Sequence, residues 1–221
     1  MIKIQNVETW GFKHAIHGMR NPLNSWDKSD SYIELCDVFV GDADLALMHK
    51  LYKAGAEHRK YLRQIFVSMD IVAPLYWWKE FDTYKVGTVA NSCSTMHKIA
   101  DKEFTLDDFS CEHLYQETYD LFRLTIDHLN KVRDIYLNRG VLRVGEAPAW
   151  FGPKDKEIWW QMIQLLPSSY NQKRTVMLNY EVLANMYESR KNHKLDEWRD
   201  FCKWTETLPY SELITGEIKH E

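Results

Sequence analysis

Side chains able to hold a polar ligand are concentrated in one stretch near the middle of the chain. The run from Ile71 to Phe81 is apolar and aromatic, and between Gly87 and Thr95 the sequence turns to small, hydroxyl and amide residues. Such residues let backbone amides and hydroxyls approach a ligand closely, and a loop that follows a buried element often presents a site. We expect a polar binding loop here; a loop that only caps its own ends is the alternative.

The sequence gives only weak signals for a cysteine nucleophile or a metal site. Cys93 and His97 are four residues apart and could pair as a nucleophile and its cation if the segment is helical, but a free cysteine is more often simply buried. His14 and His17 lie one turn apart without a third metal ligand at a telling spacing, which favours surface histidines. The sequence contains no Walker A, GxGxxG, HExxH, GxSxG or EF-hand pattern.

Composition narrows the class of protein. The 221 residues, 45% of them hydrophobic, suffice for one core, so we expect a single domain over 1–221. A net charge of -4 gives no case for binding a nucleic acid polymer. The four cysteines form no CxxC pair and are expected to be free thiols in a reducing compartment. No signal core or membrane-spanning run appears, so a cytoplasmic protein without membrane contact is expected.

Hydrophobic periodicity supplies the elements that would position the polar stretch. Period-two and 3.6-residue patterns predict a mixture of strands and helices, hence an α+β fold. We expect strands over 1–8 and 62–71, loops over 21–31 and 141–153, and helices over 11–19, 42–52, 74–84, 111–139, 155–166, 175–190 and 194–208.

The middle of the chain resembles the flavin-dependent thymidylate synthases. In that family a Gly-His turn precedes a strand, an Ala-Pro pair opens a helix, and the signature RHRxxSxNxxSxR follows. Here Gly55 and His58 resemble the turn, and Ala73-Pro74 stands in the Ala-Pro place. The order of these features is the main point of likeness.

The signature itself is altered. Thr83–Lys85 stands where RHR is expected, so only the last position keeps a cation, and Thr88 replaces the first serine. With one inserted residue, Asn91 and Ser94 fall on the asparagine and second serine, and Met96 takes the place of the final arginine. Towards the end of the chain, Leu166-Pro167, Asn179 and Arg190 also resemble the family.

The resemblance implies an α+β fold with a small antiparallel sheet and a homotetramer whose flavin sites draw on several subunits. FAD would take a hydride from NADPH, and the one-carbon group of methylenetetrahydrofolate would pass to the pyrimidine nucleotide dUMP. The implied cofactor-binding residues are His58, Lys85, Thr88, Asn91, Ser94 and Asn179. Arg190 is the implied catalytic and substrate-binding residue, with Ser92 and Thr95 also binding substrate.

Three hypotheses follow. The first is a divergent family member that methylates or otherwise modifies a pyrimidine nucleotide with FAD. The second is a non-catalytic homologue acting as an oligomeric binding or interaction protein. The third is a related flavoenzyme acting on another substrate, which would explain why the signature residues are replaced by other residues and not merely lost.

Overall fold

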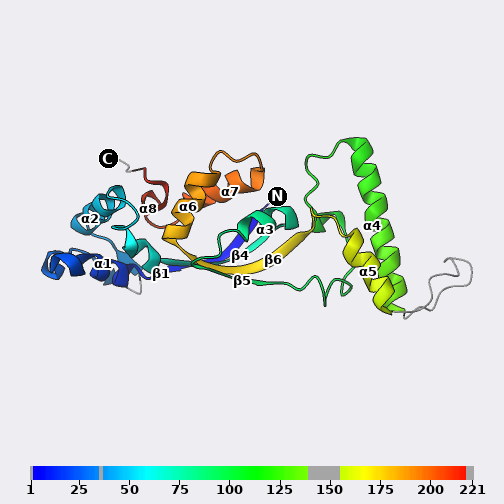
Figure 1. The fold of residues 1–221 in the computed structure, drawn as a ribbon, viewed down its shortest axis with the longest axis horizontal. Coiled ribbons are helices and arrows are strands. Elements are labelled where there is room, and N and C mark those ends of the chain that lie inside the picture. Colours follow the sequence, from blue (N-terminus) through cyan, green and yellow to red (C-terminus); the bar gives the residue numbers. More distant parts are fainter. Residues whose placement is uncertain (1, 35–36, 139–154, 218–221) are drawn as a thin grey trace, which may run out of the picture. The chain divides into compact units, whose positions relative to one another are not determined.

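The computed structural model describes residues 2–34, 37–138 and 155–217, and the chain divides into two compact units (Figure 1). One unit comprises Val72–Lys79 and Ser92–Arg174. The other comprises Ile2–Ile71, Glu80–Asn91 and the residues from Thr175 onward. We call them the helical unit and the sheet unit. That the whole chain is a single domain stays a prediction.

The sheet unit is built on a four-stranded sheet with strand order β1-β4-β6-β5. Alternate residues of its central strands point to a buried face, which includes Val67 and Met69 of β4 and Val176 and Leu178 of β6. The edge strand β5 is largely exposed along its length. The strands are β1 (Lys3–Trp10), β4 (Phe66–Pro74), β5 (Thr88–Ser92) and β6 (Asn171–Asn179), and a separate antiparallel hairpin pairs β2 (Tyr32–Glu34) with β3 (Asp37–Phe39).

Helices complete the sheet unit. Large aromatic side chains, among them Phe81, Tyr180, Trp198 and Phe201, form its most buried positions. Phe81 packs ring against ring with Trp198 and Phe201 of α7, and Tyr180 of α6 packs against Phe12 of α1. The helices are α1 (Phe12–Arg20), α2 (Asp42–Lys53), α6 (Tyr180–Arg190), α7 (Asp196–Thr205) and α8 (Glu212–Thr215), with 3-10 turns at Asn21–Leu23, Trp26–Lys28 and Lys60–Gln64.

The helical unit is centred on α4 (Gln116–Leu137) and α5 (Asp155–Leu165), which run side by side (Figure 1). Their facing apolar residues, including Ile126, Leu129, Ile158 and Met162, bury a core with the segment that leads into α4. This segment contains the 3-10 turn Leu106–Asp108. Helix α3 (Leu75–Phe81) follows β4 directly, and most of its residues belong to this unit.

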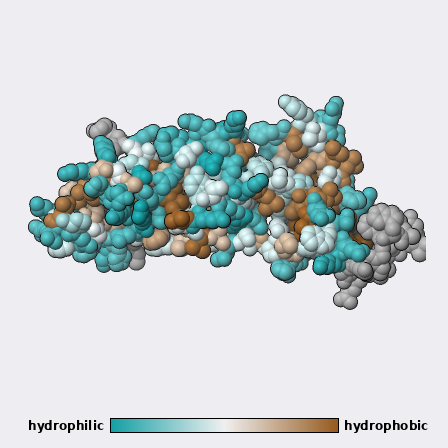
Figure 2. Space-filling view, in the orientation of Figure 1, coloured by the Kyte–Doolittle hydropathy of each residue, from teal (hydrophilic) through white to brown (hydrophobic). Residues whose placement is uncertain are grey.

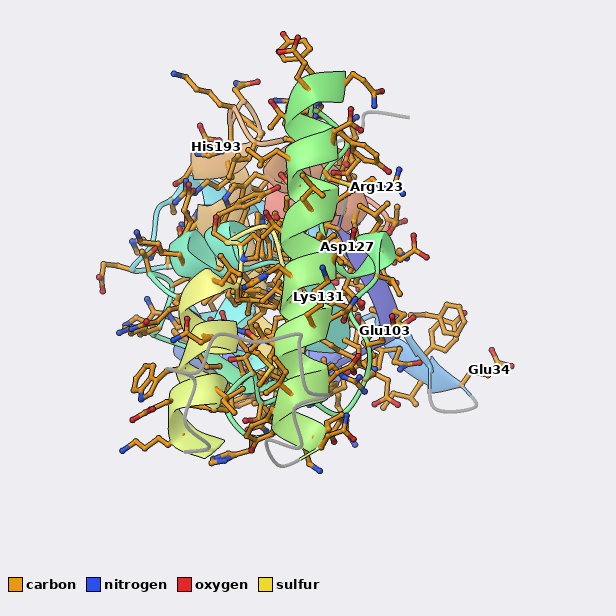
Figure 3. The ribbon with its side chains drawn as sticks, turned by 90° about the vertical axis from the view of Figure 1, so that its right-hand side faces the viewer. Glu34, Glu103, Arg123, Asp127, Lys131 and His193 are labelled. Atoms are coloured by element: carbon orange, nitrogen blue, oxygen red, sulfur yellow. The ribbon has the colours of Figure 1, made fainter. Side chains whose placement is uncertain are left out.

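The outer surface of α4 is mixed. Arg123, Asp127 and Lys131 form a charged row at four-residue spacing (Figure 3). Leu121 and Leu124 are 64% and 65% exposed, and hydrophobic residues gather around the N-terminal half of α4 in Figure 2. The predicted long helix over 111–139 is present but begins five residues later, at Gln116, because the residues before it are not helical and form a turn at Glu112 and His113.

The α+β prediction with a small antiparallel sheet is confirmed, but several boundaries were wrong. The predicted helix over 175–190 is two elements, with β6 ending at Asn179 and α6 starting at Tyr180. Residues 176, 179 and 183 fit helical spacing, yet β-branched Thr175 and Val176 suit a strand. The predicted strand over 62–71 starts at Phe66, because residues 60–64 form a 3-10 turn.

The predicted polar loop is also partly wrong, since Thr88–Ser92 is strand β5. Loop 141–153 and Cys36 lie outside the described residues, and the hairpin β2–β3 was not predicted. In the described part of the chain no helix is long and apolar enough to cross a membrane, and the cysteines there are free thiols.

Candidate functional site

Arg190 is the last residue of α6, and its side chain is held within the sheet unit by two hydrogen bonds. Its Nη1 donates to Glu80 Oε2 at 2.6 Å, and its Nε donates to Tyr84 Oη at 3.0 Å. Within the described part of the chain, Nη2 has no hydrogen-bond partner. The side chain is 19% exposed, so the guanidinium is sheltered but retains one unused edge.

Glu80 Oε2, on α3, contacts side chains from α6 and α7. Besides Arg190 it accepts a hydrogen bond from Trp198 Nε1 at 3.0 Å and lies 3.4 Å from His193 Nε2. His193 Nδ1 accepts a hydrogen bond from the backbone N–H of Leu195, which leaves Nε2 as the protonated nitrogen of the neutral ring. The carboxylate therefore accepts hydrogen bonds from the end of α6 and from α7, and His193 in the connection between these helices lies beside it.

Aromatic rings surround the Arg190 guanidinium. Its Cζ lies 4.8 Å from the centre of the Trp198 ring and 5.7 Å from that of Tyr84, both within the range of cation–π attraction. Trp198 is fully buried and stacks on Phe81. We call Glu80, Tyr84, Arg190, His193 and Trp198 the arginine cluster. The cluster holds the Arg190 guanidinium in largely apolar surroundings, where a cation attracts an anion more strongly than it does in water.

The chain from Tyr84 runs directly to the N-terminus of α6. Gly87 has φ +79°, and a Cβ atom built on it would lie 2.9 Å from Asn179 Nδ2 and 3.2 Å from Val182 Cγ2. Asn179 is the N-cap of α6, because its Oδ1 accepts a hydrogen bond from the Val182 N–H. The segment 84–88 thus contacts both ends of α6: Tyr84 bonds Arg190 at the C-terminal end, and Gly87 lies against Asn179 at the N-terminal end.

Replacing Gly87 by alanine is expected to lower the free energy of unfolding by about 2 kcal/mol. A left-handed conformation costs a residue with a Cβ about 1–2 kcal/mol, and the contact with the Asn179 amide adds to it. Urea denaturation measures the loss. The matched control is Gly55→Ala, since Gly55 has φ +104° but nothing within 4 Å of the added atom. Equal losses in the two variants would mean that the approach to Asn179 is not tight.

Three further predicted residues, Lys85, Thr88 and Asn91, lie on this part of the sheet unit. Lys85 is exposed, and within the described residues it has no ion-pair partner. Asn91 is exposed on the edge strand β5. Thr88 begins that strand, and its Oγ1 is buried without a hydrogen-bond partner in the described part of the chain. Of the predicted set, Lys85, Thr88, Asn91, Asn179 and Arg190 therefore lie in this part of the sheet unit, and His58 lies in another part of the same unit.

The other predicted residues are placed elsewhere in the chain. His58 is exposed and lines a separate cavity of about 390 Å³ with residues of α1 and of the 3-10 turn before β4, none of which belongs to the arginine cluster. Ser92, Ser94 and Thr95 belong to the helical unit, where Ser94 Oγ accepts a hydrogen bond from the His97 backbone N–H. That these four residues share a site with Arg190 stays a prediction.

Cysteine chemistry has no support in the sheet unit. Burial raises the pKa of the Cys202 thiol in α7 to about 12, so this thiol stays protonated at neutral pH. The suggested pairing of Cys93 with His97 required a helix, and residues 93–97 form no helix but an extended segment followed by a turn.

Comparisons with known proteins identify the fold. The chain has the fold of flavin-dependent thymidylate synthases and related proteins. A thymidylate synthase X from Helicobacter pylori, solved with FAD and dUMP, aligns over 100% of both chains with a TM-score of 0.68 and 14% identity. A second structure of that Helicobacter pylori enzyme with FAD and dUMP covers 97% of this chain and 100% of its own, with a TM-score of 0.66 and 14% identity.

A third solved structure is a UMP/dUMP methylase, PolB from Streptomyces cacaoi, bound with 5-Br dUMP. It covers 98% of this chain and 95% of its own, with a TM-score of 0.59 and 11% identity. No protein-family model and no curated protein matches the sequence. At these identities the similarity establishes the fold.

The groups beside Gly87 are suited to a polar cofactor such as FAD. Asn179 Nδ2 and Thr88 Oγ1 have no hydrogen-bond partner among the described residues, and Lys85 adds an unpaired cation. Polar groups that the protein leaves unsatisfied are commonly satisfied by a ligand. The charge of the site is lower than that of an RHR motif, because Thr83 and Tyr84 are uncharged.

Glu80, Tyr84, His193 and Trp198 were not predicted as parts of a site. From the sequence alone, residues of these types are usually explained without a site, as polar residues near a turn, surface histidines or aromatic residues of the core. Tyr84 stands at the histidine position of the RHR motif, and this was the single available signal. Sequence spacing could not show that one carboxylate, Glu80, accepts hydrogen bonds from two later helices.

Proposed function

We propose that this protein binds FAD and a pyrimidine nucleotide and methylates dUMP to dTMP, or performs a closely related flavin-dependent modification of such a nucleotide. The observation that carries the proposal is the full-length similarity to folds solved with FAD and dUMP. It would act in the cytoplasm as a homotetramer, with NADPH and methylenetetrahydrofolate as co-substrates.

The proposed residues divide by role. Arg190 would hold the nucleotide through its unused Nη2 edge, since a guanidinium matches phosphate or uracil oxygens. Glu80 and Tyr84 would orient that guanidinium, and Trp198 would exclude water from its other face. Lys85, Thr88, Asn91 and Ser94 would hold the flavin pyrophosphate, His58 and Asn179 would border the flavin ring, and Ser92 and Thr95 would contact the nucleotide with Arg190.

Bound FAD would supply the redox chemistry, and the protein would bind and orient the reactants. No side-chain nucleophile is required by this proposal. This agrees with the protonated state of the buried Cys202 thiol.

The decisive test is an absorption spectrum of the purified protein before and after FAD is added, followed by titration with dUMP. A flavin spectrum, or saturable uptake of added FAD, is expected. A colourless protein that takes up no FAD would remove the flavoenzyme proposal. In an FAD-binding protein, dUMP should perturb the flavin absorption, and cytidine should not.

Replacing Lys85 by alanine is expected to weaken FAD binding by about tenfold or more, because a charge-assisted hydrogen bond contributes about 1.5–3 kcal/mol. Fluorescence titration of FAD measures the change. The control is Lys203→Ala, since Lys203 is exposed on α7 and lies 3.9 Å from Asp200. An unchanged titration for Lys85→Ala would show that Lys85 does not contact the cofactor.

The second candidate is a non-catalytic homologue that acts as an oligomeric binding or interaction protein. The observation that favours it is the engagement of Arg190 by Glu80, Tyr84 and Trp198, which gives this residue a structural role without any ligand. A stable oligomer that binds neither FAD nor dUMP is the result expected from this candidate.

A further inference from the structure

A cavity of the sheet unit is formed by α1 and the β2–β3 hairpin and is not lined by any residue of the arginine cluster. It has a volume of about 580 Å³ and is lined by α1, the Trp26 turn and the β2–β3 hairpin. None of the lining residues that the structure describes belongs to the predicted flavin and nucleotide set. Its size is within the range of about 300–1,000 Å³ that small-molecule sites occupy.

A buried arginine forms part of the cavity lining. Arg20 is 4% exposed, its Nε donates to Asp44 Oδ1 at 2.5 Å, and its Nη1 donates to the Ser25 carbonyl at 3.2 Å. Its Nη2 has no hydrogen-bond partner within the described residues. A guanidinium fixed in this way presents its remaining donors at little entropic cost, which is what an anion site requires.

The rim of the cavity is cationic. Lys13, His14 and His17 lie on the exposed face of α1, and none of the described lining residues is acidic. Since Asp44 compensates the charge of Arg20, Lys13 is the remaining full charge among the described lining residues when the histidines are neutral. This balance suits a ligand with a single negative charge.

Aromatic surfaces form the remaining walls. Trp26 is 45% exposed and stacks on His17 with ring centres 6.0 Å apart, and Tyr32 is 57% exposed on the hairpin. Ile33 and Val38 of the same hairpin add apolar surface. Exposed rings next to cations bind flat apolar groups that carry a charge.

We propose that this cavity binds a small aromatic carboxylate: a flat ring packs against Trp26 and Tyr32, and a single carboxylate meets Arg20 and Lys13. The site is independent of the proposed flavin and nucleotide site. It would remain if the protein bound no FAD.

The test is isothermal titration of the full chain with naphthoate and with the uncharged, similarly shaped naphthamide. Naphthoate is expected to bind with a single saturable site, about tenfold or more tighter than naphthamide, because only the acid pairs with the cations. Equal affinities for the two ligands, or no saturable binding of naphthoate, would overturn the proposal.

Two variants place the binding at this cavity. Lys13→Glu is expected to weaken naphthoate binding by about tenfold and leave naphthamide binding unchanged, whereas Trp26→Ala should weaken both. The matched control is Lys28→Glu, which makes the same charge change at an exposed residue that does not line the cavity. Equal weakening by Lys13→Glu and Lys28→Glu would show general surface electrostatics and reject the site. All three substituted residues are exposed, so the variants are expected to fold normally. Circular dichroism of each variant checks this.

Discussion

Replacing Asp44 by asparagine is expected to lower the free energy of unfolding by about 3–5 kcal/mol, the loss typical when one partner of a buried ion pair is removed. The Asp44 side chain is fully buried, and its Oδ1 accepts from Arg20 Nε at 2.5 Å. Its Oδ2 accepts from the hydroxyls of Ser29 and Ser31, each at 2.6 Å. Asparagine offers an N–H₂ group where the surrounding groups are donors, so Arg20 keeps a buried charge without its counterion.

Urea denaturation at neutral pH measures this loss, and the control is Asp42→Asn. Asp42 lies in the same first turn of α2 but is exposed, so removing its charge should cost less than about 1 kcal/mol through the helix dipole. If both variants lost stability equally, the buried pair would contribute no more than a surface carboxylate.

The same carboxylate predicts acid sensitivity. Burial alone would raise the pKa of Asp44, but hydrogen bonds from Ser29, Ser31 and Arg20, together with the charge of Arg20, outweigh burial and lower the pKa. A group whose pKa is lower in the folded state contributes stability above its unfolded pKa and loses it as pH falls through the folded pKa. The stability difference between the native protein and Asp44→Asn should therefore be constant near neutral pH and shrink in strong acid.

Asp44 also shows what sequence could supply. A helix over 42–52 was predicted, and α2 begins at Asp42. The residue that caps the helix start lies outside this range, because Asp30 Oδ1 and Oδ2 accept hydrogen bonds from the N–H groups of Asp44 and Ala43. Asp44 turns instead towards Arg20, 24 residues earlier. Long-range pairing of this kind leaves no periodic signal in the sequence.

Helical periodicity was the most reliable guide, because an apolar stripe must face a core. It gave α2 and α5 within a residue or two and the extent of α4 within five. It was ambiguous at β6, where apolar spacing fits two periods over a short window. The strand is determined by its neighbours β4 and β5, which the local sequence does not reveal.

The candidate site was predictable in part. Arg190 and Asn179 were identified through the family resemblance, and the structure shows that the 84–88 segment lies against both: Tyr84 bonds Arg190 and Gly87 approaches Asn179. Glu80 was not identified. Its importance comes from accepting donors of Arg190 and Trp198, 110 and 118 residues later in the chain.

Replacing Arg190 by alanine is expected to weaken dUMP binding by about tenfold to a hundredfold or more, if Arg190 contacts the nucleotide as proposed. A hydrogen bond to a charged group contributes about 1.5–3 kcal/mol, and a guanidinium can form two to one ligand. Isothermal titration with dUMP measures the loss. The control is Arg63→Ala, since Arg63 is exposed in the 3-10 turn before β4 and does not belong to the arginine cluster. Equal affinities for the native protein and Arg190→Ala would remove Arg190 from the site.

Arg190→Ala also leaves Glu80 without its ion-pair partner, so a structural effect must be separated from a binding effect. Glu80→Gln breaks the same ion pair but keeps an amide oxygen that can accept the Arg190 hydrogen bond and orient the guanidinium. Because it also removes a competing negative charge, it should leave dUMP affinity unchanged or increased. If Arg190 served only to hold Glu80, both variants would lose similar stability and neither would change dUMP binding. If it binds the nucleotide, the two variants share a loss of stability and differ in affinity. This difference in affinity distinguishes a ligand-binding arginine from one that only stabilises the junction of α6 and α7.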